Sequence, residues 1–246
     1  MELSFSVDSW SAWSSNLVSR SDWIDWAQGK EVPREEHEPD VSTIPAMKRR
    51  RMSRVSRMAI ATALDCLGDL EDKPVCVFAS RHGELERTVR IINSIISEQD
   101  VSPTDFSLSV HNTALGLFSI HTGNTCPATT VVAGENTFAM SLIEASIHLR
   151  RFPGKPVLLV YFDEPVTEPL DKLDLGPKQA LCVALLLSDS DHSEITVQRD
   201  IVRSSEGKSV NKPDELAYEF LRFFLTGEEK RTTKTRAGFW SWYRQK

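Results

Sequence analysis

The chain has 246 residues, of which 40% are hydrophobic and 26% are charged, a composition typical of a folded globular protein. Its 29 lysines and arginines against 35 aspartates and glutamates give a net charge of −6, which argues against general nucleic-acid binding. The four cysteines and six histidines lack zinc, redox-pair or metal-ligand spacing, so no cofactor is expected. No signal peptide and no apolar run long enough to span a bilayer is found, so a cytoplasmic protein is expected.

The N-terminal region combines a predicted strand, a short helix and a polar loop. Residues 3–7 alternate apolar and polar side chains, which predicts a strand. Ser21-Asp22 can cap a short helix over the two tryptophans that follow. Residues 31–45 are rich in proline, glutamate and aspartate, so a solvated loop is expected there.

A basic run precedes the first long helix. Residues 48–51 are Lys-Arg-Arg-Arg and lead into residues 52–67, where apolar side chains fall at helical spacing. Cations in the first turn of a helix oppose its dipole. We therefore expect these cations to serve something other than helix stability.

The rest of the chain alternates apolar strands with amphipathic helices. Buried strands are predicted over 75–79, 129–133, 156–162 and 180–187, and helices over 83–98, 135–149 and 213–224. This alternation indicates an α/β layered fold with helices on both sides of a sheet. Because the second half has fewer crossover helices, it is expected to include antiparallel strands. Residues 228–246 form a basic, aromatic tail.

One segment, residues 107–145, has the pattern of a nucleophile turn. A loop containing Asn112 and Gly116 is followed by the strand over 129–133, a sharp turn at Gly134 and the start of a helix. A side chain at such a turn is exposed at a helix N-terminus, where backbone N–H groups stabilise an anion.

This segment resembles the β-ketoacyl synthases of the thiolase-like superfamily. Residues 80–84 (SRHGE), 107–112 (SLSVHN) and 161–165 (YFDEP) add local similarity. Together they resemble the β-ketoacyl-synthase-like N-terminal domain of bacterial aryl polyene pigment clusters, over residues 48–188. The resemblance implies a thiolase-like layered α/β/α fold, truncated to roughly the N-terminal half of a ketosynthase, and a single domain over 1–246.

The sequence departs from that family where the chemistry occurs. In the family, this strand ends in an Ala-Cys-Ser motif whose thiolate takes up the acyl chain. Here Gly134 takes the cysteine position, and glycine cannot form a thioester. The adjacent Glu135 is a poor acyl acceptor and suits the first turn of a helix. The family's two later catalytic histidines have no counterpart, because His192 is the last histidine.

The resemblance therefore implies a noncatalytic subunit. In type II polyketide systems a subunit without the cysteine, the chain length factor, pairs with an active ketosynthase, and the growing chain lies in a tunnel at their interface. The same role is expected here: a heterodimer with a ketosynthase in aryl polyene biosynthesis, with an acyl carrier protein as a further partner. Two alternatives stay open. One is a residual thioester decarboxylase or hydrolase, and the other is a standalone acyl- or carrier-binding module.

The resemblance also gives three sets of candidate residues. Candidates to line the tunnel, for which core packing is the alternative, are Leu85, Thr88, Val89 and Ile92. Candidates for the partner interface are His111, Asn112, Leu115, Phe118, Phe138 and Met140, with Phe138 also expected to fill the space beside Gly134. Candidates to steer an acidic carrier protein, with a solvated helix face as the alternative, are Lys48, Arg49, Arg50, Arg51 and Arg54. Trp10, Trp13, Trp240 and Trp242, near the two ends of the chain, are candidates for interface anchors, with packing in the chain's own core as the alternative.

Overall fold

The structure is a computed structural model that describes residues 2–173, 177–189, 194–200, 215–235 and 238–245. In these residues eight strands form one mixed sheet, in the order β3-β2-β4-β5-β1-β6-β8-β7. The strands are β1 (Glu2–Ser14), β2 (Val75–Ala79), β3 (Ala128–Val131), β4 (Val157–Asp163), β5 (Leu181–Ser188), β6 (Ile195–Asp200), β7 (Lys230–Thr235) and β8 (Gly238–Arg244). The α-helices are α1 (Arg20–Ala27), α2 (Ala46–Arg49), α3 (Arg54–Leu67), α4 (Leu85–Ile96), α5 (Pro103–Ser107), α6 (Thr113–Thr122), α7 (Thr137–Arg151) and α8 (Glu215–Thr226). None of the described helices has the length and apolar character needed to cross a membrane.

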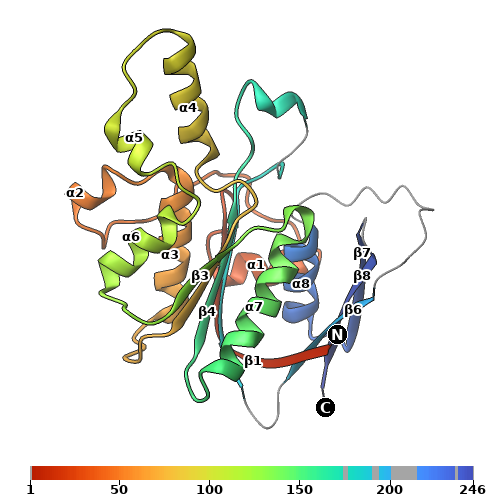
Figure 1. The fold of residues 1–246 in the computed structure, drawn as a ribbon. Coiled ribbons are helices and arrows are strands. Elements are labelled where there is room, and N and C mark those ends of the chain that lie inside the picture. The colour runs from red at the N-terminus through yellow and green to blue at the C-terminus, as the bar shows by residue number, and fades with distance from the viewer. Residues whose placement is uncertain (1, 174–176, 190–193, 201–214, 236–237, 246) are drawn as a thin grey trace.

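Different helices cover the two faces of the sheet. Figure 1 shows α3 and α6 on one side of β4, and α7 and α8 on the other. Because successive strand residues point to opposite faces, Phe78 and Val160 join the core under α3 and α6. Their neighbours Val77 and Leu159 join the core under α7 and α8. The predicted layered α/β/α fold is confirmed.

The sheet is parallel at one end and antiparallel at the other. β2 pairs in parallel with both β3 and β4, with Cys76 opposite Ala128 and Leu158. β5, β1, β6, β8 and β7 then add on in antiparallel pairs, and of these β5 to β8 are the antiparallel strands expected in the second half of the chain. The carboxyl ends of β2, β3 and β4 therefore meet at one edge of the sheet, where α/β proteins place their sites.

The N-terminal elements differ from the prediction in extent. β1 continues beyond residue 7 to Ser14, because its pairing with β5 runs on through Trp13 and Ser14. The N-cap residue of α1 is Ser19, not Ser21, and Asp22 completes the cap. The Ser19 hydroxyl accepts from Asp22 N at 3.1 Å, and the Asp22 carboxylate accepts from Ser19 N at 2.9 Å, which is a capping box.

The basic run 48–51 lies before the long helix. Its first two residues belong to the short helix α2, and its last two to the turn that follows. α3 begins only at Arg54, with Ser53 as its N-cap, whose hydroxyl accepts from Ser56 N at 3.1 Å. The prediction that these four cations lie in the first turn of the long helix was therefore wrong.

The C-terminal tail over 228–246 is, in its described part, a β-hairpin. β7 pairs with β8, and β8 pairs with β6, so the hairpin extends the sheet. Trp240 and Trp242 are almost fully buried in the core beneath α7 and α8, and Trp13 is buried in the opposite core. Trp10 is partly buried against Phe224, with ring centroids 6.2 Å apart. Packing in the chain's own core thus accounts for these tryptophans.

Candidate functional site

The turn after β3 has the predicted strand–turn–helix geometry. β3 ends at Val131, a single 3-10 turn spans Gly134–Asn136, and α7 follows at Thr137. Gly134 has φ +58°, a conformation that side chains disfavour. A Cβ placed on Gly134 would meet no surrounding atom within 4 Å, so space for a side chain at this turn is open.

Phe138 does not fill that space, contrary to the prediction. Its ring is buried, 5.5 Å from the ring centroid of Tyr161 and 5.3 Å from that of Phe220. The reason is helical geometry, because Phe138 belongs to the face of α7 that packs on the sheet.

Two side chains hold the turn in place. The Thr137 hydroxyl accepts from Ala133 N at 3.0 Å and donates to the Gly134 carbonyl at 2.7 Å. The indole Nε1 of Trp240 donates to Asn136 Oδ1 at 2.9 Å, which links the turn to β8. The turn is therefore held in a fixed conformation, although it lacks a reactive side chain at Gly134.

A buried carboxylate joins the ends of β4 and β2. Asp163 accepts from the Ser80 hydroxyl at 2.9 Å, from Arg81 N at 2.8 Å and from His82 N at 3.1 Å. Burial raises the pKa of Asp163, whereas these hydrogen bonds favour its ionised form. Because Asp163 holds three successive residues, it fixes the loop that leads toward α4.

That loop needs a glycine beside His111. Gly83 has φ +54°, and its N–H donates to the Ser80 hydroxyl at 2.7 Å. A Cβ on Gly83 would lie 3.0 Å from Cδ2 of His111, so the imidazole packs directly on the glycine. Burial lowers the pKa of His111, while the Ser80 backbone and the Asp163 carboxylate oppose that effect. The predicted interface residue His111 is thus part of this loop cluster.

An ion-pair network at the base of α4 escaped sequence analysis. Glu84 is buried and accepts from the Ser53 hydroxyl and from Arg87 Nε, both at 2.7 Å. The same arginine donates to Asp105 of α5 at 2.6 Å. The Glu84–Arg87 spacing of three residues was a signal for the local pair, but Ser53 and Asp105 are brought in only by the fold.

The α4 helix projects beyond the sheet together with α5 (Figure 1). Among the predicted tunnel residues, Val89 is buried, Leu85 and Thr88 are partly buried, and Ile92 is 47% exposed. Core packing therefore accounts for the apolar side chain of Val89 but not for that of Ile92, which is exposed.

The apolar face of α4 continues outward from Ile92. The exposed apolar side chains on α4 and α5 are Ile92, Ile95, Ile96 and Phe106. The exposed fractions of Ile96 and Phe106 are 73% and 68%. We call these four residues the α4–α5 apolar face.

Three of the six predicted interface residues are buried, and the other three are partly or fully exposed. The segment expected to be a loop forms α6, and Leu115 and Phe118 on it are buried. Phe118 packs on Phe78, with centroids 5.4 Å apart, and Met140 is partly buried against the core under α7. Asn112, just before α6, is exposed. Leu115, Phe118 and Phe138 therefore pack within the chain's own cores.

The predicted carrier-protein residues fall into two groups. Lys48, Arg50 and Arg51 are exposed, and Arg49 is partly exposed. Arg54 instead pairs with Glu38 at 3.1 Å and with Glu164 at 3.6 Å, and lies over the ring of Trp13. Arg54 therefore serves the chain's own packing, and the first four residues form the free basic surface.

The most informative feature that sequence analysis missed is the position of β3. It was predicted to be buried, but it is the edge strand, with Ala128 exposed and residues 129–131 partly exposed. Cys76 N donates to Pro127 O, and Ser80 N donates to Val131 O, so alternate residues of β3 bond to β2. The backbone of Thr130 consequently faces outward. The small side chains of Ala-Thr-Thr-Val were a signal for this exposure.

These features define the class of the protein. Helices on both faces of a mixed sheet, with a strand–turn–helix at the carboxyl end of a parallel strand, make it a thiolase-like protein of the ketosynthase fold. Residues 23–243 match the family model described as the N-terminal domain of beta-ketoacyl synthase. The chain belongs to this family.

Solved structures agree with that assignment. The chain is similar to a ketosynthase (ApeO) in complex with its chain length factor (ApeC) from Xenorhabdus doucetiae, at 25% identity and TM-score 0.81, covering 98% of this chain and 100% of that chain. It shares the fold of the ishigamide ketosynthase/chain length factor, at 14% identity and TM-score 0.66, covering 80% and 67%. It also shares the fold of AntDE:AntF, a type II carrier protein in complex with its ketosynthase, at 14% identity and TM-score 0.60, covering 82% and 70%. A comparison with curated proteins found no match.

Proposed function

We propose that this chain is a noncatalytic ketosynthase-like subunit, a chain length factor, that pairs with an active β-ketoacyl carrier-protein synthase. The observation that carries the proposal is Gly134, because a nucleophile turn with the right geometry holds no side chain that could carry an acyl group. The similarity to a ketosynthase–chain length factor complex supports it, since the matched chain of that complex is covered over its whole length.

The β3 edge is the surface we propose for the ketosynthase. An uncharged edge strand with an outward-facing backbone at Thr130 can accept a strand from another chain. Val132, just beyond β3, is 54% exposed and adds apolar area to this surface. Strand pairing would cover both the free backbone groups and the apolar side chain.

The α4–α5 apolar face is the wall we propose for the acyl tunnel. Its exposed isoleucines and Phe106 form an apolar surface on a helix pair that stands clear of the sheet. The Glu84–Arg87–Asp105 network anchors this pair, so its position is fixed before a partner arrives. A polyene chain is apolar and would be shielded from water against such a face. We propose that the subunit acts in type II polyketide biosynthesis of the aryl polyene type.

The free basic surface of Lys48, Arg49, Arg50 and Arg51 suits an acidic carrier protein. The cations are exposed on α2 and the following turn, where they can steer a negatively charged partner. The similarity in fold to a ketosynthase that binds a carrier protein supports a carrier protein as a partner.

Co-expression with the full-length ketosynthase of the same gene cluster tests the proposal. Size-exclusion chromatography with light scattering is expected to give a one-to-one complex. A chain that elutes alone while the ketosynthase forms its own dimer would overturn the proposal and favour a standalone binding module.

A malonyl-carrier turnover assay tests the enzymatic alternative. The isolated chain is expected to show no decarboxylation or hydrolysis, with the Glu135→Ala and Cys126→Ala variants as controls. Turnover that one of these substitutions abolishes would establish a residual enzyme and refute the noncatalytic assignment.

A further inference from the structure

A groove lies on the α3 side of the sheet, away from the nucleophile turn. It runs between α3 and the loop over 31–45 and has a volume of about 630 Å³, within the range of ligand pockets. Its apolar part is formed by Trp13 and Ile44, which are buried, by Ala61 and Leu64, which are partly buried, and by the exposed Val18. The groove therefore has an apolar floor that is accessible from solvent.

The rim of the groove is mainly acidic. Its carboxylates are Glu38, Asp40, Asp65 and Asp69, and His37 also lines it, whereas no lysine or arginine does so among the described residues. Glu38 pairs with Arg54, whereas the other three have no ion pair within the described residues. Asp65 accepts a hydrogen bond from the uncharged Ser11 hydroxyl at 2.6 Å, which leaves its negative charge in place.

The four carboxylates come from two stretches of the chain, the loop over 31–45 and the end of α3 with the turn after it. Asp40 belongs to the loop, Asp65 to α3, and Asp69 to the turn after α3. Within the described residues, no three acidic, histidine or cysteine side chains are grouped so that they could hold a metal ion. An extended ligand with several separated positive charges fits this distribution better than a single cation does.

The groove is also separate from the proposed ketosynthase surface. Its β-strand residues, Ser11 to Trp13, belong to β1, and β1 is separated from the β3 edge by β5, β4 and β2. A ligand in the groove would therefore leave the β3 edge free.

We propose that this groove docks a cationic segment of a partner protein, in which lysines or arginines alternate with apolar residues. The apolar side chains would lie on Trp13, Val18 and Leu64, and the cations would face the carboxylates of the rim. The proposal does not depend on the ketosynthase-like function, because the groove shares no residue with the nucleophile turn or the β3 edge.

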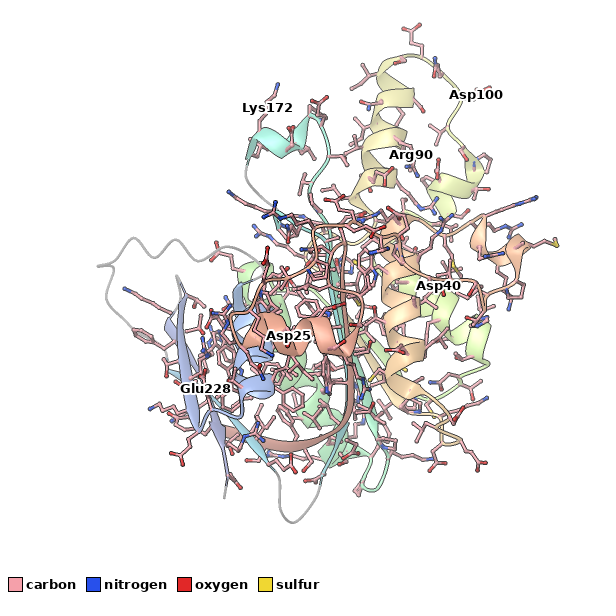
Figure 2. All side chains as sticks on the ribbon, turned by 180° about the vertical axis from the view of Figure 1, so that it is seen from behind. Asp25, Asp40, Arg90, Asp100, Lys172 and Glu228 are labelled. Carbon is pink, nitrogen blue, oxygen red and sulfur yellow. The ribbon has the colours of Figure 1, made fainter. Side chains whose placement is uncertain are left out.

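Fluorescence anisotropy of a labelled twelve-residue peptide of alternating lysine and leucine tests the proposal, with the full chain as receptor. Binding is expected to weaken about tenfold in the double variant Asp65→Lys/Asp69→Lys, because attraction becomes repulsion. The matched control is Glu98→Lys/Asp100→Lys, which has the same change in net charge. Figure 2 shows Asp100 at the far end of the α4 projection, well away from Asp40.

The outcomes are distinct. The proposal is supported if the control variant keeps its affinity for the peptide and Val18→Ser binds it more weakly. Both the charges and the apolar side chains of the peptide would then contribute to binding in the groove. Equal loss in both charge variants would overturn the proposal in favour of general attraction to an acidic protein. Competition by spermidine as strong as that by the unlabelled peptide would show a small-cation site instead. Concentration-dependent dimerisation that Asp65→Lys/Asp69→Lys abolishes would show that a second copy is the occupant.

Discussion

The two edge strands of the sheet, β7 and β3, differ in charge. At one end β7 carries Lys230, Arg231 and Lys234 along six residues. At the other end β3 has four residues and no charge. Charged side chains on an edge strand deter other strands from pairing with it, because pairing would bury them. The β7 edge is therefore protected, and the β3 edge is open to a partner.

The two ends differ in electrostatics as well. Near β7, Arg231 pairs with Glu228 at 2.6 Å, and hydrogen bonds from Arg231 lower the pKa of Glu228. After β4, burial raises the pKa of Glu164 to about 7, with Arg54 opposing and Glu86 and Glu84 adding to the rise. The charge of Glu228 is thus compensated by Arg231, whereas the charge of Glu164 is compensated only in part by Arg54.

The largest expected effect comes from blocking the open edge. Thr130→Pro removes an outward-facing N–H without removing a bond to β2, and should weaken pairing with the ketosynthase about a thousandfold, measured by co-purification and biolayer interferometry. The matched control is Thr232→Pro on β7. Because Arg244 N donates to Glu229 O, alternation along β7 places the Thr232 backbone outward too. Equal loss from both substitutions would show that the β3 edge is not the specific interface.

A smaller effect is expected from Glu164, the partly buried carboxyl group just after β4. A raised pKa means that the stability contributed by protonated Glu164 is complete below about pH 4.5 and is lost as the pH rises through about 7. Glu164→Gln should therefore raise the free energy of unfolding at pH 8 by at most about 3 kcal/mol and change little at pH 4. Urea unfolding at both pH values measures this, with the exposed Glu168→Gln as control.

Glu228 gives the opposite sign at the other end of the sheet. Because its pKa is lowered, its contribution is present above the unfolded pKa of about 4.5 and is lost as the pH falls through the folded value. Glu228→Gln should therefore destabilise the chain at neutral pH but not in acid. The same direction of pH dependence in Glu164→Gln and Glu228→Gln would contradict the electrostatic contrast between the two ends.

The smallest expected effect comes from removing charge at the protected edge. Lys230→Thr/Lys234→Thr makes β7 resemble β3, and should lower the concentration at which the chain self-associates by about tenfold. Light scattering across a concentration series measures this, and Lys155→Thr/Lys172→Thr, which removes two cations elsewhere, is the control. Equal self-association of both variants would show that net charge, not the edge, governs self-association.

The sequence determined the layered fold and the nature of the turn. Apolar strands such as Val75–Ala79 and Val157–Asp163, alternating with amphipathic helices, were enough to predict helices on both faces of a sheet. The strand, Gly134 and the helix that follows were predictable because turn geometry and helix initiation depend on residues close together in the chain.

Only the tertiary structure decided which surfaces are free. β3 looks like a buried strand in sequence, but its place at the edge depends on which strands pair. Phe118 and Phe138 look like possible contacts, but helix packing buries them, while Ile95 and Ile96 stay exposed because α4 leaves the sheet. The acidic groove joins carboxylates from separate segments. Exposure depends on long-range packing, and a local sequence pattern does not contain that information.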